Sequence, residues 1–245
     1  MSAEIIVLPS KQAVAEALAD RTATALRAAL TEKKRVTLCL TGGSTPVTAY
    51  ARLAEAEGID WGRVHLFWGD ERCVPPDHPE SNFAMANRTL IRPASIPKTN
   101  VHKMPGDCPP PEGSVVYEQA LEQFFGADLR FDVLHLGMGE DGHTASLFPG
   151  TDALGETDRR VTVGHAPASA AVRDRLTLTF PALAKADLCL VAAAGAGKRG
   201  AFTEVLDAYD GEAVGPPIAR VEVDGTMVWL VDRELASGLA DDDEG

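Results

Sequence analysis

A histidine follows a glycine-rich turn in the stretch GMGEDGHTASLFPG, residues 137–150. His143 comes two residues after Asp141, and the apolar run FDVLHL precedes the turn. A neutral imidazole at the mouth of a buried strand is able to take a proton from water, and a nearby carboxylate is able to orient the ring or shape the turn. We predict that His143 is a general base supported by Asp141. The alternative is a surface histidine that caps the loop locally.

The first six residues of this stretch also have the G-x-G-x-x-G spacing of a dinucleotide-binding turn. A long helix opens within such a motif, whereas Phe148, Pro149 and Gly150 would end a helix here soon after its start. No strand ending in an acidic residue follows about 20 residues later, as the dinucleotide motif requires. The glycines are therefore expected to let the backbone turn sharply and present Asp141 and His143.

A second stretch, TGGSTP at residues 41–46, has the composition of an anion site. It follows the apolar run RVTLCL and precedes a helical pattern, so backbone N–H groups at Gly42 and Gly43 and the hydroxyls of Ser44 and Thr45 would face a phosphate. One alternative is an ordinary capped turn with Ser44 or Thr45 as the N-cap. The other is a nucleophile elbow around Ser44, but Pro46 stands where its last glycine is needed.

Two basic residues near the predicted loops are candidates to bind the same anion. Lys198 lies in GAGKR at a strand–helix junction, and Arg175 opens the strand-like run RLTLTF. GAGKR departs from a P-loop, because Ala192 replaces a required glycine and Arg199 replaces the Ser or Thr that should follow the lysine. Lys198 and Arg175 could each pair with a phosphate or remain a solvated surface charge.

A third polar stretch, GDERCV at residues 69–74, places Asp70 and Arg72 after another apolar run. Arg72 could bind a substrate anion or stabilise a developing oxyanion, and whether it pairs with substrate or with Asp70 is open. A metal site that includes His78 or His143 is an alternative, but the spacing matches no standard metal motif. We predict no metal and no other cofactor.

Composition excludes several classes of protein. The chain has 245 residues, of which 45% are hydrophobic, and its formal net charge of −13 argues against a nucleic-acid partner. The first residues do not form a basic segment followed by an apolar one, so we expect no signal peptide. No run of about 18 apolar residues occurs, so we expect no membrane span. Four widely spaced cysteines are expected to be reduced thiols. We expect one domain over residues 1–240, an acidic tail at 241–245, a cytoplasmic location and a monomer.

Apolar runs and helical patterns alternate through most of the chain. Strands are expected at 4–9, 35–40, 64–71, 131–138, 160–165, 175–180, 187–194 and 226–232. Helices are expected after Ser10 and at 45–58, 81–91, 114–125 and 198–209, with a long loop at 92–112. Because the runs are continuously apolar, they predict a mainly parallel, doubly wound α/β sheet with helices on both faces. The runs at 160–165 and 175–180 are expected to form a small local antiparallel element.

The polar stretches described above all follow strand-like runs. In an open parallel sheet, ligands bind beyond the carboxyl ends of the strands. Loops that are distant in the sequence are therefore expected to converge on one pocket.

Taken in order, TGGSTP, VHLFWGDERCVPPDHPESN, LGMGEDGHTASLFPGT, RLTLTFPAL and GKRGAF resemble the 6-phosphogluconolactonase family. The match spans about residues 36–230, and its superfamily also contains sugar-phosphate isomerases and glucosamine-6-phosphate deaminase. The resemblance implies a modified Rossmann-like sheet and a phosphorylated sugar lactone as the substrate. It implies hydrolysis of 6-phospho-D-glucono-1,5-lactone to 6-phosphogluconate without a required metal.

Carried onto this sequence, the resemblance makes His143 the base and places Arg72 near the substrate. Gly42, Gly43, Ser44 and Thr45 match the sugar-phosphate loop, Arg175 and Lys198 match basic residues near the phosphate, and Asp70 and Asp141 match polar positions of less defined role. In the deaminase and isomerase branch an acid stands five residues after the histidine, where this chain has Phe148. A non-catalytic sugar-phosphate-binding protein is the third possibility.

Overall fold

The computed structural model describes residues 3–211 and 214–237. The acidic tail predicted at 241–245 lies outside this range. The strands are β1 (Glu4–Leu8), β2 (Val36–Leu40), β3 (Val64–Trp68), β4 (Asp70–Arg72), β5 (Phe131–Gly137), β6 (Val161–His165), β7 (Asp174–Leu178), β8 (Ala186–Ala193) and β9 (Thr226–Asp232).

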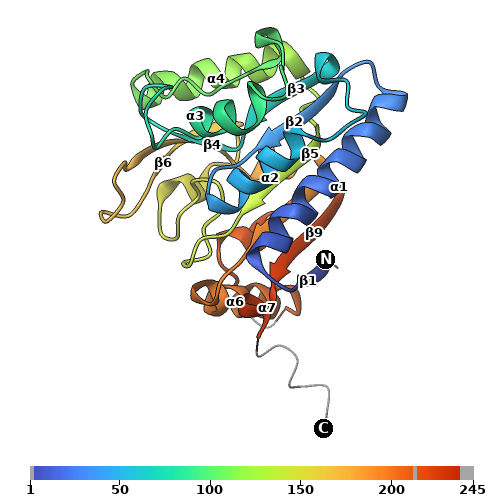
Figure 1. Ribbon diagram of the computed structural model, residues 1–245. Coiled ribbons are helices and arrows are strands. Elements are labelled where there is room, and N and C mark those ends of the chain that lie inside the picture. Colours follow the sequence, from blue (N-terminus) through green and yellow to red (C-terminus); the bar gives the residue numbers. More distant parts are fainter. Residues whose placement is uncertain (1–2, 212–213, 238–245) are drawn as a thin grey trace.

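The α-helices alternate with these strands (Figure 1). They are α1 (Lys11–Glu32), α2 (Ser44–Ala54), α3 (Asn82–Ala86), α4 (Pro110–Phe125), α5 (Phe180–Leu183), α6 (Arg199–Tyr209) and α7 (Arg233–Ala236). Among the residues that the structure describes, none of the helices combines the length and the apolar character needed to span a bilayer.

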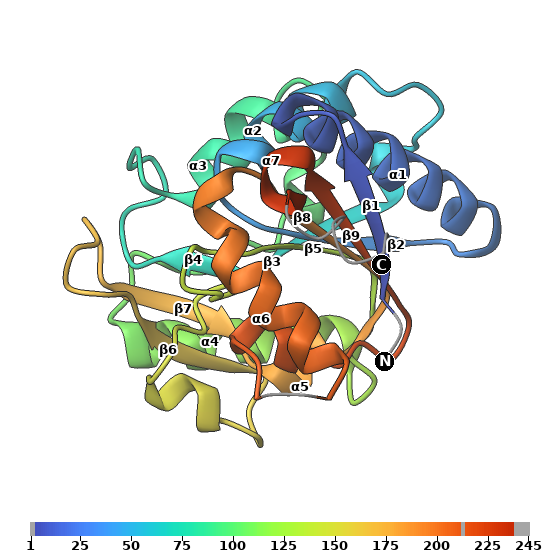
Figure 2. The same cartoon turned by 90° about the horizontal axis from the view of Figure 1, so that it is seen from below.

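Six parallel strands form the central sheet, in the order β1-β9-β8-β5-β2-β3. Figure 2 shows α1, α2 and α3 on one side of this sheet, and α6 together with a smaller sheet on the other. Strand β2 is fully buried, and β5, β8 and β9 are largely buried. Because both faces of these strands are covered, their sequences are continuously apolar. The predicted α/β class and mainly parallel sheet are confirmed.

The strand order reverses between β2 and β5. From β2 the chain passes through α2 to β3 on one side, whereas β5 leads to β8 and β9 on the other side. The loops that leave β2 and β5 therefore diverge from adjacent strand ends. This topological switch point is where open α/β sheets bind their ligands.

The smaller sheet is antiparallel, in the order β4-β7-β6. The predicted pairing of the runs at 160–165 and 175–180 is confirmed as the β6–β7 hairpin. The single strand predicted at 64–71 is wrong: it divides at Gly69, whose N–H donates to Leu40 of the large sheet while its carbonyl accepts from Leu178 of the small one. The chain therefore changes sheets just before Asp70.

Three local predictions also need correction. The apolar run at 4–9 predicts a strand covered on both faces, but β1 is an edge strand with Ile5 38% and Val7 51% exposed. The helix predicted to run to Gly58 ends at Ala54. The loop predicted at 92–112 is shorter, because its last prolines begin α4 at Pro110, where a missing N–H costs no helical hydrogen bond.

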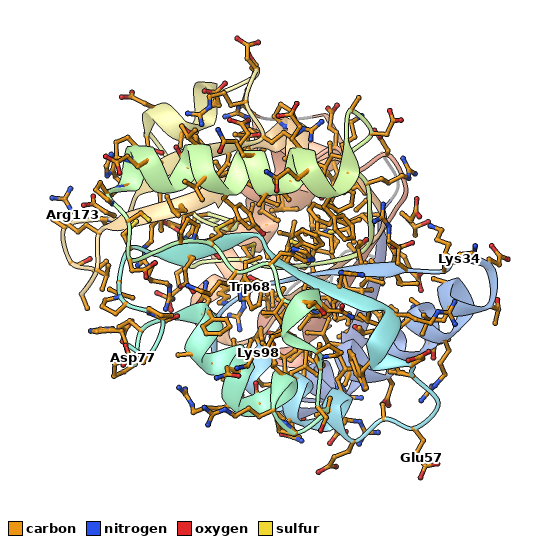
Figure 3. All side chains as sticks on the ribbon, turned by 90° about the horizontal axis from the view of Figure 1, so that it is seen from above. Lys34, Glu57, Trp68, Asp77, Lys98 and Arg173 are labelled. Carbon is orange, nitrogen blue, oxygen red and sulfur yellow. The ribbon has the colours of Figure 1, made fainter. Side chains whose placement is uncertain are left out.

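Large apolar side chains fill the space between the layers. Trp68 is fully buried, and Figure 3 shows it in the interior, while charged side chains such as Lys34, Glu57 and Asp77 point outwards at the periphery. Phe202 of α6 packs against Trp229 of β9, with ring centroids 5.3 Å apart. All four cysteines are unpaired, and two of them lie in this core.

One polar side chain, His135 of β5, is buried within the core beneath α1 and α2. The Thr22 hydroxyl donates to the Leu18 carbonyl at 2.6 Å, so it accepts from His135 Nε2 at 2.7 Å. The Tyr50 hydroxyl lies 3.3 Å from His135 Nδ1 and accepts the Thr41 N–H at 2.9 Å. Burial lowers the pKa of His135 from 6.5 to about 3.

Folding stability is therefore expected to fall with acidification. In the unfolded chain His135 takes up a proton near pH 6.5, whereas in the folded protein the His135 ring stays neutral down to about pH 3. Between pH 7 and pH 5 the parent should lose about 2 kcal/mol more unfolding free energy than His135→Gln, whose amide retains a donor and an acceptor. Urea unfolding of both proteins at the two pH values measures this difference. Equal losses would show that His135 does not contribute.

Candidate active site

A pocket of about 540 Å³ opens at the carboxyl ends of β3, β2, β5 and β8. All ten residues singled out from the sequence line it, and none lies elsewhere: Gly42, Gly43, Ser44, Thr45, Asp70, Arg72, Asp141, His143, Arg175 and Lys198. The expected convergence of distant loops on one pocket is confirmed. Their roles depend on the contacts that follow.

His143 and Asp141 form a hydrogen-bonded pair on the turn after β5. The imidazole Nδ1 lies 2.5 Å from Asp141 Oδ1, which also accepts the His143 backbone N–H at 3.1 Å. Burial acts to raise the pKa of the Asp141 carboxyl, but the hydrogen bonds from His143 outweigh it and hold that pKa below its ordinary value. The ionised carboxylate keeps the proton on Nδ1, which leaves the lone pair of a neutral ring on Nε2.

Two glycines allow this turn. A Cβ on Gly139 would lie 2.1 Å from His143 Nδ1, so the ring rests where any side chain would stand. Gly142 has a φ of +72°, and a Cβ there would lie 2.3 Å from Pro216. No helix opens in the turn, since the next helical segment after β5 is the short 3-10 helix Asp152–Gly155. The G-x-G-x-x-G spacing thus serves the histidine rather than a long phosphate-binding helix.

Arg72 and Arg175 stand directly opposite each other in the β4–β7 ladder. Arg175 is only 7% exposed, and its Nε and Nη1 have no hydrogen-bond partner among the described residues, nor does Nε of Arg72. Burial, and next the charge of Arg72, lower the pKa of Arg175. Two neighbouring guanidinium groups at the pocket wall, both with N–H groups that lack acceptors, are suited to bind an anion.

The sequence left open whether Arg72 pairs with the substrate or with Asp70, and in the structure its side chain contacts Glu80. It donates from Nη1 to the Glu80 carbonyl and lies 3.7 Å from the Glu80 carboxylate. It makes no ion pair with Asp70 in this structure. The guanidinium is thus tethered at one end, while its buried Nε has no hydrogen-bond partner among the described residues.

Asp70 is buried and joins three loops. It accepts the Ser146 hydroxyl at 2.7 Å and the Asn82 amide at 3.3 Å. Asn82 in turn fills the space above Gly42, where a Cβ would lie 2.1 Å from its Oδ1. Sequence reasoning missed Asn82 and Ser146, although both lie within the motif stretches that carry the resemblance.

The alternative of a metal at GDERCV finds no support in the contacts. Glu71 accepts backbone N–H groups of Asn82 and Phe83 at 2.7 Å each, and His78 Nδ1 accepts the Glu80 N–H at 3.1 Å. Within residues 3–211 and 214–237, no three His, Cys, Asp or Glu side chains are grouped to hold a metal ion. Glu71 instead fixes the start of α3.

The loop after β2 leads directly into α2. Gly43 is the N-cap residue with a φ of +106° and no side-chain cap, so the predicted alternative of Ser44 or Thr45 as the cap is wrong. The Lys11 ammonium donates to the Ser44 hydroxyl at 2.7 Å, which leaves that hydroxyl's own hydrogen free to donate. Sequence reasoning missed Lys11, because it belongs to no motif and reaches the loop only through the fold.

Lys198 lines the same pocket at the start of α6. Burial lowers the pKa of Lys198, and so does the nearby charge of Lys11, whereas Glu140 and Asp232 act in the opposite direction. The two lysines, the uncapped N–H groups of α2 and the Ser44 hydroxyl form a second cluster of donors.

The long loop at 92–112 contributes nothing to the pocket wall. Its Ile96 and Met104 are buried, and its His102 N–H donates to Leu66 of β3. The loop between β6 and β7 lines the pocket instead, through Ala166, Pro167 and Ala170.

Comparison with known proteins agrees with this geometry. The model of the family described as glucosamine-6-phosphate isomerases/6-phosphogluconolactonase matches residues 9–229. A 6-phosphogluconolactonase of Nostoc sp. is 38% identical over 245 residues, which cover 98% of this chain and 100% of the relative.

Solved structures are also similar over nearly the full chain. A 6-phosphogluconolactonase from Thermotoga maritima is 32% identical with a TM-score of 0.83, and the match covers 94% of this chain and 100% of that one. A monomeric glucosamine-6-phosphate deaminase is 19% identical with a TM-score of 0.81, covering 96% and 99%. The second match shows the shared fold alone.

Proposed function

Because the chain belongs to the glucosamine-6-phosphate isomerase/6-phosphogluconolactonase family, we propose that it hydrolyses 6-phospho-D-glucono-1,5-lactone to 6-phosphogluconate, with His143 as the general base. The observation that carries the proposal is the Asp141–His143 pair facing the same pocket as the unpartnered donors of Arg175. A base and an anion-binding group are the two elements that a phosphorylated lactone requires.

The donors around the pocket support binding of the phosphate. Arg175 and Lys198 would supply charge, and the loop of Gly42–Thr45 would supply backbone N–H groups and hydroxyls at the start of α2. A phosphate there would relieve the repulsion between Arg175 and Arg72. Phosphate binding would thereby fix the sugar ring against the turn that carries His143.

His143 would then activate water. Its Nε2 takes a proton as the water oxygen bonds to the lactone carbonyl carbon, and Asp141 stabilises the imidazolium that forms. The carbonyl oxygen becomes an oxyanion, for which the guanidinium of Arg72, a residue of the pocket wall, is a candidate donor.

The second half of the reaction breaks the ester. The oxyanion collapses, the bond between the carbonyl carbon and the ring oxygen breaks, and the imidazolium returns its proton to that oxygen. The product is one open chain with a hydroxyl and a carboxylic acid, and the acid releases its proton to the solvent to become a carboxylate. A lactone is an activated ester, so one base, one water and hydrogen-bond donors suffice and no covalent enzyme intermediate is required.

The contacts of Phe148 favour the lactonase over the deaminase and isomerase branch. Its ring lies against the His143 imidazole, with centroids 4.3 Å apart. An apolar ring at this place offers no carboxylate for the proton transfers of ring opening and isomerisation. It restricts the imidazole and shields one side of it from water.

We further propose that the enzyme works as a monomer without a metal or other cofactor. The ten residues assigned here come from one chain, so the scheme requires no partner subunit. The substrate is a small phosphorylated sugar lactone.

A coupled assay tests the proposed function. Glucose-6-phosphate dehydrogenase generates the lactone in place, and 6-phosphogluconate dehydrogenase reports its hydrolysis as NADPH. We expect NADPH formation to exceed the spontaneous rate in proportion to the concentration of this protein. If there is no acceleration but ammonia is released from glucosamine 6-phosphate, the protein belongs functionally to the deaminase branch; if neither occurs, a binding protein is indicated.

A further inference from the structure

Glu140 lies between the turn glycine Gly139 and Asp141, and its side chain lines the pocket. The Glu140 carboxylate rests on the backbone of Gly197, where a Cβ would lie 2.5 Å from Oε1 and 3.2 Å from Cδ. Gly197 immediately precedes Lys198 and the start of α6. The Glu140 carboxylate, which belongs to the same turn as His143, therefore lies near Lys198, a residue assigned to the phosphate.

The two acids near Lys198 differ in how they are held. Asp232 is buried, and its Oδ1 accepts the backbone N–H groups of Gly195 and Leu235 at 3.0 Å each. Glu140 is exposed and accepts no hydrogen bond from the described part of the chain. Asp232 thus has a structural task at the end of β9, whereas the charge of Glu140 is free to act on whatever occupies the pocket.

Four influences act on the pKa of Lys198. Burial and Lys11 both disfavour its protonated form, and Glu140 is the first of the two acids that oppose them. When a phosphate dianion binds at Lys198, the same carboxylate repels it. The substrate must therefore bind against a fixed negative charge in its own pocket.

This repulsion does not act equally on substrate and product. Opening the lactone creates a carboxylate, so the product carries one negative charge more than the substrate. The new carboxylate forms at the carbon attacked beside His143, on the same turn as Glu140. A fixed charge there destabilises the bound product more than the bound substrate.

We propose that Glu140 is an internal counter-ion to Lys198 whose negative charge weakens binding of the anionic product, so that the pocket empties after each turnover. The identity of the product rests on the proposed function. The charge relation itself depends only on the placement of Glu140, Gly197 and Lys198.

Titration calorimetry of the whole protein with inorganic phosphate and with 6-phosphogluconate tests the proposal without any activity measurement. Glu140→Gln removes the charge and keeps the shape of the side chain. We expect it to bind 6-phosphogluconate about 5-fold more tightly than the parent and phosphate by a smaller factor, since one charge pair about 4 Å apart is worth about 1 kcal/mol in water, which corresponds to about 5-fold. In steady-state assays the product should become a stronger inhibitor of this variant.

Two matched variants separate local charge from other effects. Glu140→Asp retains the carboxylate and should bind both anions like the parent. Glu204→Gln removes an exposed acid from α6 that does not line the pocket, and should change both affinities less than 2-fold. Unchanged or weaker binding in Glu140→Gln, or equal tightening in Glu140→Asp, would overturn the proposal.

The outcomes also distinguish this inference from the proposed function. If the parent binds phosphate and responds to Glu140→Gln as expected but hydrolyses no lactone, the counter-ion stands and the assigned substrate is wrong. If the parent hydrolyses the lactone and Glu140→Gln does not tighten product binding, the function stands and the counter-ion is wrong.

Discussion

Replacing His143 with alanine is expected to lower kcat for the phosphorylated lactone by about 10²- to 10⁴-fold, the range that a positioned general base contributes. The KM should change little, because the residues assigned to the phosphate are untouched. The physical reason is the loss of an imidazole that lines the pocket and is held through Nδ1 on the Asp141 carboxylate. The coupled assay with purified variant measures the effect.

A matched control exists elsewhere in the chain. His165 of β6 also lies beside a carboxylate, with Nδ1 3.1 Å from Asp174 Oδ1, but it does not line the pocket. His165→Ala should keep near-parental kcat, and both variants should retain the parent's circular dichroism spectrum. Near-parental activity of a folded His143→Ala protein would falsify the assignment of the base.

Replacing Arg175 with glutamine is expected to raise the KM for the phosphorylated lactone by about 10²-fold, corresponding to about 2–3 kcal/mol for a buried charge that binds an anion. Arg175 is 7% exposed and its guanidinium has two nitrogens without partners among the described residues, so a phosphate would supply hydrogen bonds that the protein does not. The melting temperature should not fall, because the variant removes a cation that repels Arg72. Lys198→Ala should raise KM in the same direction.

Arg173→Gln is the corresponding control, since Arg173 is exposed, belongs to the same hairpin and does not line the pocket. Unphosphorylated glucono-1,5-lactone supplies the second comparison. The parent should use it poorly, and Arg175→Gln should not change that rate. If the parent hydrolysed both lactones equally well, the assignment of the phosphate-binding residues would be wrong.

The relation between Asp141 and His143 could be predicted from the sequence because it is local. The two residues are separated by a single glycine, and a hydrogen bond across so short a loop depends only on the turn that Gly139 and Gly142 allow. The same holds for the turn of TGGSTP into the start of α2, which Gly43 allows with a φ of +106°. The fold class followed from apolar runs that stay buried on both faces.

Element boundaries were less accurate where tertiary contacts compete with local pattern. The run through β3 and β4 is continuous in the sequence, yet it divides at Gly69 because Leu40 and Leu178 offer hydrogen bonds in two different sheets. Likewise, β1 has the apolar composition of a central strand but lies at the edge of the sheet. A single strand's composition does not reveal how many neighbours it has.

The sequence by itself determined the α/β class, the pairing of His143 with Asp141 and the glycine turn that opens α2, since these depend on periodicity and on residues a few positions apart. Only the tertiary structure decided that Arg72 faces Arg175, that Lys11 reaches Ser44 and that Glu140 rests on Gly197. These pairs come from segments far apart in the chain, and strand order and register bring them together. Because parallel strands are joined by long crossovers, neighbouring strands need not be neighbours in the sequence, and the charges that meet at the pocket become visible only in the folded chain.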